Sequence, residues 1–138
     1  QEAKKGEAIG EVPVGAVIVK DGKVITSAHN LKEIQHDATA HAEILAIKKA
    51  SQILGDWRLT ECEIYVTLEP CAMCAAAILH ARLKRVVYGV SDPKWGGETK
   101  LNLFSEKQFN HKVEHVCLNS KRCENLLKIF FRKKRFHV

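Results

Sequence analysis

Short apolar segments alternate along the chain with segments that have helical spacing. Strands are predicted where β-branched and apolar residues run for six or seven positions, and helices where apolar residues recur at three- and four-residue intervals. The five predicted strands are 14–20, 23–28, 62–68, 85–90 and 113–118, and the four predicted helices are 2–9, 41–54, 71–82 and one beginning near residue 120. This order predicts an α/β domain with a mixed, five-stranded sheet.

Two connections define part of the topology. Asp21-Gly22 is a two-residue turn between apolar strands, which is typical of a hairpin. The strand–helix–strand order from 62 to 90 predicts a right-handed parallel crossover. The segment 91–110 contains Pro93, Gly96 and Gly97, and is predicted to be a long irregular loop of the kind that usually has a function.

The helix predicted over 41–54 is apolar on nearly all sides, apart from two lysines and a glutamine. We expect such a helix to be deeply packed, so that polar residues in its first turn are sheltered from water. Thr39 is available as its N-cap, and Gly55 is expected to end it. In the next helix, the small residues Ala75 to Ala77 permit close packing, either on the sheet or against another subunit.

The last predicted helix has one apolar face and one basic face. Asn119 or Ser120 is expected to cap it. Phe131, beside the apolar stripe, is expected to pack in the core, and stacking on a base or ribose is the alternative. The stripe consists of Cys123, Leu126, Leu127 and Phe130, and the basic residues off the stripe include Lys128, Arg132 and Arg135. Seven of the chain's 22 basic residues lie between 121 and 135. Such a cluster favours a polyanionic partner, although a solvated basic face is the alternative.

Composition limits the class of protein. A chain of 138 residues, 46% apolar and 28% charged, is expected to form one globular domain, residues 1–138. The net charge of +6 again favours nucleic acid. No apolar run has membrane-spanning length, and five cysteines without a signal peptide indicate a reducing compartment, so we expect a cytoplasmic protein. The chain starts at Gln1 instead of a methionine, which leaves open a trimmed start and a lost targeting segment.

The candidate chemistry lies in two short motifs. Cys71 and Cys74 are three positions apart at a helix start, directly after Pro70, so their sulfurs point to one side. Thiolates are favoured at a helix N-terminus, and His41 is a suitable third ligand for zinc. Three Cys and His ligands leave a fourth tetrahedral position open, which is typical of a catalytic zinc.

Glu43 adds a proton carrier to this metal site. Two residues beyond His41, it is expected to point near the metal without binding it, and to move a proton from a bound water to a substrate nitrogen. A bare C-x-x-C is also typical of a redox pair or half a structural zinc site, and a lone histidine is often a core residue. The combination H-x-E with P-C-x-x-C is instead the established pattern of zinc-dependent nucleobase deaminases.

Over almost its whole length the chain resembles the bacterial tRNA-specific adenosine deaminases, which belong to the zinc-dependent cytidine/deoxycytidylate deaminase superfamily. Eight segments that occur in the same order carry the resemblance: GEVPVGA at 10–16, AHN at 28–30, TAHAE at 39–43, WRL at 57–59, YVTLEPC at 65–71, VYG at 87–89, NH at 110–111 and FF at 130–131. The resemblance implies a three-layer α/β/α cytidine-deaminase-like fold. It also implies hydrolytic conversion of the wobble adenosine of a tRNA anticodon to inosine, by a homodimer with one Zn²⁺ per subunit.

The resemblance also implies roles for individual residues. His41, Cys71 and Cys74 would bind zinc, and Glu43 would move protons. The remaining residues are substrate contacts: Asn30 at the flipped base, Ala72 elsewhere in the substrate-binding site, Asp92 and Lys94 in a loop on the anticodon, and Arg132 and Arg135 on the RNA. A turn-forming asparagine remains the alternative for Asn30.

The chain departs from the family at several places. Ala38 stands where the family commonly has proline, the stretch 95–104 (WGGETKLNLF) replaces a run of small residues, and 80–82 reads HAR. The first helix is also shorter than in the family. Two other functions remain open. One is a free nucleobase or nucleoside deaminase acting on guanine, cytosine or cytidine, and the other is a non-catalytic, zinc-containing RNA-binding subunit, against which Glu43 argues.

Overall fold

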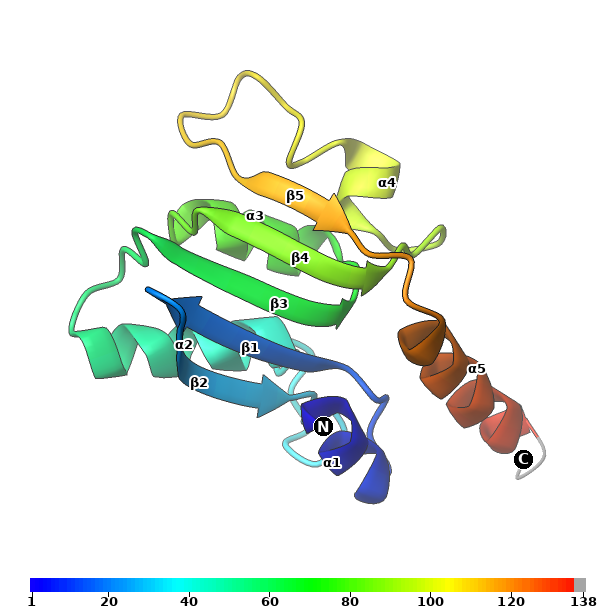
Figure 1. The fold of residues 1–138 in the computed structure, drawn as a ribbon. Coiled ribbons are helices and arrows are strands. Elements are labelled where there is room, and N and C mark those ends of the chain that lie inside the picture. Colours follow the sequence, from blue (N-terminus) through cyan, green and yellow to red (C-terminus); the bar gives the residue numbers. More distant parts are fainter. Residues whose placement is uncertain (136–138) are drawn as a thin grey trace.

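A mixed five-stranded sheet forms the centre of the molecule (Figure 1). The computed structural model describes residues 1–135. The strand order is β2-β1-β3-β4-β5, with β1 antiparallel to both of its neighbours and β3, β4 and β5 mutually parallel. The strands are β1 (Gly15–Lys20), β2 (Lys23–His29), β3 (Cys62–Leu68), β4 (Arg85–Val90) and β5 (Glu114–Cys117). The predicted mixed sheet, the Asp21-Gly22 hairpin turn and the parallel crossover are confirmed.

Among residues 1–135, five helices pack around this sheet, one more than predicted. They are α1 (Glu2–Ala8), α2 (Ala42–Leu54), α3 (Ala72–His80), α4 (Gly97–Leu101) and α5 (Lys121–Arg135). The prediction that 91–110 is wholly irregular was therefore wrong. The short α4 has no apolar periodicity of its own, and its first backbone amides are held by a carboxylate from another part of the chain.

The helix ends agree with the capping residues and bounds predicted from the sequence, with two exceptions. Gly55, in the left-handed conformation, ends α2 as predicted, and the Ser120 hydroxyl accepts the Cys123 N–H at the start of α5. Thr39 does not cap α2, because its N–H and hydroxyl both donate to Asp37. Helix α3 ends before the predicted Arg82, which has a positive φ of 64°.

Helices α2 and α3 cover one face of the sheet and bury the main core (Figure 1). Alanines Ala42, Ala46 and Ala50 allow α2 to lie close to Ile18 and Ile64 of the sheet. The expectation that α2 is buried on nearly all sides was wrong, since Ile53 on its other side is 61% exposed. Its first turn is nevertheless sheltered, and that turn carries Glu43.

Helices α1 and α5 form the third layer, on the opposite face of the sheet. Two strand glycines permit their close approach, because a side chain at Gly15 would meet the backbone of Ala3, and one at Gly89 would meet Cys123. Glu2 fastens α1 to β2 by accepting hydrogen bonds from Ser27 and His29. The hydrogen bonds from His29 and Lys5 lower the pKa of Glu2 to about 2. No helix within residues 1–135 is long and apolar enough to cross a membrane.

Candidate active site

Three metal-ligand side chains meet at the N-termini of α2 and α3. His41 is the N-cap residue of α2, Cys71 is the N-cap residue of α3, and Cys74 lies in the first turn of α3. The Nδ1 atom of His41 lies 3.7 Å from the Cys71 sulfur and 3.5 Å from the Cys74 sulfur. Tetrahedral zinc with Zn–S of about 2.3 Å and Zn–N of about 2.0 Å requires an N···S separation of about 3.6 Å. The three side chains therefore fit a zinc ion.

The electrostatics of these ligands favour a bound cation. Hydrogen bonds from the Cys74 thiol and the His41 ring lower the pKa of Cys71 to about 4. The same hydrogen bond to Cys71, together with burial, raises the pKa of Cys74, and the Cys71 thiolate raises that of His41. The cluster thus holds protons between the sulfurs and the ring nitrogen. A metal ion at this point would displace those protons and take up the negative charge of the sulfurs.

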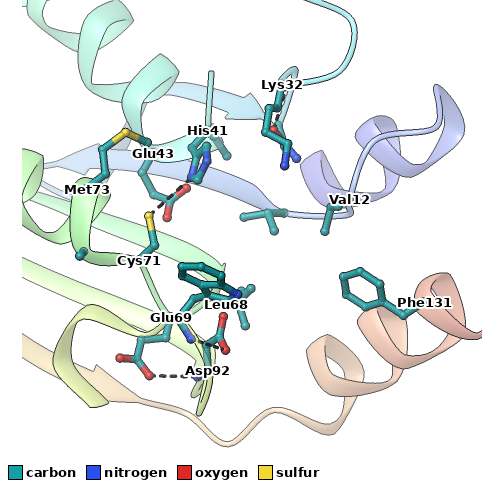
Figure 2. A pocket seen from close by; sticks show the side chains of 15 residues that line it. Val12, Lys32, His41, Glu43, Leu68, Glu69, Cys71, Met73, Asp92 and Phe131 are labelled. Carbon is teal, nitrogen blue, oxygen red and sulfur yellow. Dashed lines mark hydrogen bonds between the residues drawn. The ribbon is translucent and has the colours of Figure 1, made fainter. Parts of the chain in front are cut away.

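Glu43 is a buried carboxyl group beside this cluster. It is 3% exposed, in the first turn of α2, and Figure 2 shows it converging with His41 and Cys71 on one side of the pocket. Burial raises its pKa from the ordinary value of 4.5 to about 7. A carboxyl group with a pKa near neutrality can both accept and return a proton at physiological pH.

The cluster opens into a cavity of about 500 Å³, which brings together most of the residues predicted from sequence. Asn30, Ala72 and Asp92 line it with His41 and Glu43. The Asn30 side-chain oxygen also accepts the Lys32 N–H at 3.0 Å, so this residue both forms a turn and faces the pocket.

Lys32 lines this cavity, but Lys94 and Arg132, the basic residues predicted to contact RNA, lie outside it. Lys94 and Arg132 line a neighbouring pocket of about 750 Å³ together with Lys128 of α5. The two pockets share Asp92 and Trp95 of the loop after β4 and Phe131 of α5. The Arg135 side chain lies outside the described residues, so its predicted role in RNA binding is untested.

Phe131 was expected to pack in the core, and this was wrong. Its side chain is 48% exposed, and Figure 2 shows the ring pointing towards the pocket from α5. Leu127 and Phe130 occupy the buried side of the helix instead. The sequence signal was ambiguous because Phe131 borders the apolar stripe without belonging to it.

The residues missed from the sequence include Lys32, which lines the catalytic cavity, as well as Trp95 and two buried glutamates. Trp95 contributes to both pockets, and two buried glutamates hold the loops at the pocket's rim. Glu11 accepts the backbone N–H groups of Glu33 and Ile34 at 3.0 and 2.8 Å. Glu69 accepts the backbone N–H group of Asp92, in the segment that follows β4, at 3.0 Å. The sequence does contain a signal for these two glutamates. Each is a single acidic residue close to a proline in an otherwise apolar stretch, Glu11 in EVP (11–13) and Glu69 in LEP (68–70).

The mixed sheet and the cluster at two helix N-termini define a cytidine-deaminase-like protein. A family described as MafB19-like deaminase matches residues 1–135. The tRNA-specific adenosine deaminase of Bacillus subtilis (strain 168) is 48% identical over 137 residues, which cover 98% of this chain and 85% of that protein. The chain belongs to the family of tRNA-specific adenosine deaminases.

Two solved structures are also similar to this chain in their three-dimensional fold. One comes from a study of A-to-I editing by tRNA:A34 deaminases at the wobble position of transfer RNA. It is 43% identical with a TM-score of 0.86, covering 91% of this chain and 93% of that one. The guanine deaminase of Bacillus subtilis is 30% identical with a TM-score of 0.65, covering 95% of this chain and 87% of that one. The three-layer fold expected from sequence is confirmed.

Proposed function

We propose that this protein is a hydrolase that deaminates adenosine to inosine at the wobble position of a tRNA anticodon. The observation that carries the proposal is the buried Glu43 beside the His41–Cys71–Cys74 cluster, in a cavity that adjoins a basic pocket. The family to which the chain belongs supports the choice of tRNA and of adenosine. A reaction on tRNA is consistent with the cytoplasmic location expected from sequence.

Zinc is the metal that this ligand set fits best, with one ion per subunit. Two sulfurs and one imidazole nitrogen are ligands that zinc prefers, and their ligand atoms lie within 4.8 Å of one another. A set of three protein ligands leaves one tetrahedral position for a water molecule. When bound, zinc would activate that water for attack on C6 of the adenine ring.

The protein's own residues would bind the base and move the protons. Glu43 would take the proton released from water and deliver it to N1 of the ring. It would then carry the remaining hydroxyl proton to the amino group, so that the bond from C6 to this nitrogen breaks and ammonia leaves. Its burial keeps competing water away and its pKa near the working pH. Asn30 has amide N–H donors available for the base even while its oxygen accepts the Lys32 N–H. The small Ala72, at the start of α3, leaves room for a purine.

A single-stranded anticodon loop fits the surface around the cavity. Such loops are recognised by splaying out bases, which then stack on aromatic side chains, while basic side chains hold the phosphates. Trp95 and Phe131 provide exposed aromatic rings at the rim, and Lys94, Lys128 and Arg132 provide the charge. Asp92 lies at the boundary between the two pockets, where a nucleotide next to the adenosine would pass.

The substrate is the point to test first, because guanine deaminase shares the fold. The zinc-loaded protein would be incubated with a stem-loop carrying adenosine at the wobble position, and separately with adenosine, guanine and cytidine. Mass spectrometry of the nucleosides would measure inosine, xanthine and uridine. We expect inosine in the stem-loop alone. Turnover of a free base or nucleoside as fast as the stem-loop would contradict the tRNA assignment.

We also propose a homodimer, as expected from the family resemblance. Ala75, one of the small residues for which packing on the sheet or against another subunit was left open, is buried within the subunit, where it contacts Gly97. The candidate interface is instead a neighbouring hollow between α3 and the loop before β5, where the Phe109 ring is 42% exposed. Its lining residues include Ala76, Leu79, Arg82, Phe109 and His111. Sedimentation at micromolar concentration should give the mass of two chains, and a fully active monomer would exclude the dimer.

The basic pocket leads to a further prediction, about RNA affinity. Replacing both Lys128 and Arg132 by glutamine should weaken stem-loop binding, because each basic side chain that neutralises a phosphate contributes through counterion release. Removing one such side chain should flatten the plot of log affinity against log salt by about 0.7 for a single strand. Single-turnover deamination at saturating RNA should remain close to that of the parent, since neither residue lines the catalytic cavity.

A matched variant controls for net charge. Lys48 and Lys49 are exposed on α2 and line neither pocket, so replacing both by glutamine removes the same charge elsewhere. Affinity should be measured over a salt series for both double variants. Equal losses in the two would mean that only the overall charge matters and that α5 presents a solvated basic face.

A further inference from the structure

Glu69 is a buried carboxylate whose hydrogen bonds all go to one segment, which consists of the loop after β4 and the first turn of α4. It follows directly after β3, two positions before Cys71, and is 2% exposed. Its oxygens accept the Asp92 N–H at 3.0 Å, the Glu98 N–H at 3.1 Å, and both the N–H and the hydroxyl of Thr99 at 2.8 and 2.6 Å. Figure 2 draws the bond to Asp92. The parallel pairing of β3 with β4 makes this possible, because it brings the carboxyl ends of both strands to one edge.

These hydrogen bonds hold the segment 92–99 in place. This segment, which includes the first residues of α4, is here termed the rim loop. Asp92, itself held by Glu69, accepts the N–H groups of Lys94 and Trp95 at 3.0 and 3.1 Å. The Gly97 N–H donates to the carbonyl oxygen of Pro70 at 2.8 Å. One buried carboxylate thus supports the loop that places Trp95, 67% exposed, at the wall shared by the two pockets.

Gly96 shows how closely the loop is fitted to this carboxylate. Its backbone pairs with Cys71, and its φ of −61° is open to any residue. A Cβ at this position would nevertheless collide with the Glu69 carboxylate and lie 2.6 Å from the Asp92 carbonyl oxygen. Glycine is therefore required here by the close approach of the carboxylate.

We propose that Glu69 is a positioning residue that holds the rim loop in its RNA-binding arrangement before RNA arrives. The inference rests on the proposed function and adds the residue that prepares its substrate surface. A buried charge is costly unless it is fully hydrogen-bonded, and four donors from one loop meet that need. If the loop is already ordered before RNA binds, no conformational entropy is lost in ordering it during binding. The RNA therefore binds more tightly.

Glu69→Gln separates positioning from general stability. The substitution keeps the shape but places an amide NH₂ against N–H donors, which disconnects part of the loop. We expect KM for the stem-loop to rise by at least about tenfold, as binding shared by ground and transition states is lost. The kcat at saturating RNA should stay within about twofold, and zinc content should remain one equivalent. A lower kcat at unchanged KM would instead show a partly unfolded enzyme and overturn the inference.

Trp95 gives a readout that is independent of activity. In a Trp57→Phe background it is the only tryptophan, and the decay of its fluorescence anisotropy reports the mobility of the rim loop. We expect faster decay in Glu69→Gln, and also in Gly96→Ala, which displaces the same carboxylate. Glu11→Gln is the matched control, because Glu11 is an equally buried carboxylate that holds the loop at Glu33 and Ile34 instead. Its Trp95 decay should match that of the parent.

The outcomes distinguish this inference from the proposed function. If the parent does not deaminate the stem-loop, the proposed function fails, while the Trp95 decay and the stem-loop affinity of the variants still decide whether Glu69 positions the loop. If Glu69→Gln does not fold, Gly96→Ala takes its place in the same measurements. A parental KM, or parental affinity, with a parental Trp95 decay in the variant would overturn the inference.

Discussion

Glu43→Gln is expected to abolish deamination while the protein still binds zinc and the stem-loop. The amide has nearly the shape of the carboxylate, so the fold and the three metal ligands should be undisturbed. It cannot take up and return a proton, however, and a general acid–base group contributes about 10²–10⁴-fold to a rate. Glu43 is expected to act in more than one step, including the attack of water on C6 and the proton transfer to N1. The deamination rate should therefore fall by an amount in at least the upper part of that range.

The measurement is single-turnover deamination of the stem-loop by zinc-loaded parent and variant, with metal content and RNA affinity determined on the same samples. Glu33→Gln is the control, because it removes an exposed carboxylate that lies outside the pocket. Glu43→Gln activity within a few times that of the parent would contradict the proposed mechanism. A parallel loss of zinc would mean that Glu43 acts through the metal site instead of through the proton.

The regular part of the fold could be predicted because its signals are local. Strands β3 and β4 were predicted with the observed ends, since each is a run of β-branched and apolar residues bounded by polar ones. The clustering of three possible metal ligands could be predicted for a similar reason. His41 and Cys71 lie at helix starts, where the chain itself orients the side chains, and Cys74 follows Cys71 by one helical turn.

The remaining features depend on contacts that no local pattern contains. Helix α4 exists where Glu69, 30 residues earlier, accepts the Thr99 N–H. Thr39 bonds to Asp37 instead of capping α2, and Phe131 faces the pocket because Leu127 and Phe130 fill the buried side of α5. The contacts of Asn30, Ala72, Asp92, Lys94 and Arg132 with RNA stay predictions, although the structure places these residues along the two pockets.

Cys74→Ser should remove most of the bound zinc and destabilise the fold around α3. The Cys74 side chain is fully buried, and Cys71 and Cys74 are the two cysteines that lie with His41 in the cluster. A serine hydroxyl is a much poorer zinc ligand than a thiolate, and even changes to the groups that support a ligand cost about 10–100-fold in affinity. Loss of a ligand should therefore weaken zinc binding by at least about 10²-fold.

Cys62→Ser is the matched control for this variant, since Cys62 is another fully buried cysteine, in β3 and away from the cluster. Both variants place a hydroxyl in an apolar position, but only Cys74→Ser should lower zinc below one equivalent. Because a bound ion stabilises the folded state, a chelator should lower the Tm of the parent and of Cys62→Ser by several degrees. It should leave the Tm of Cys74→Ser nearly unchanged. A full equivalent of zinc in both Cys74→Ser and Cys71→Ser would mean that the ligands are misassigned.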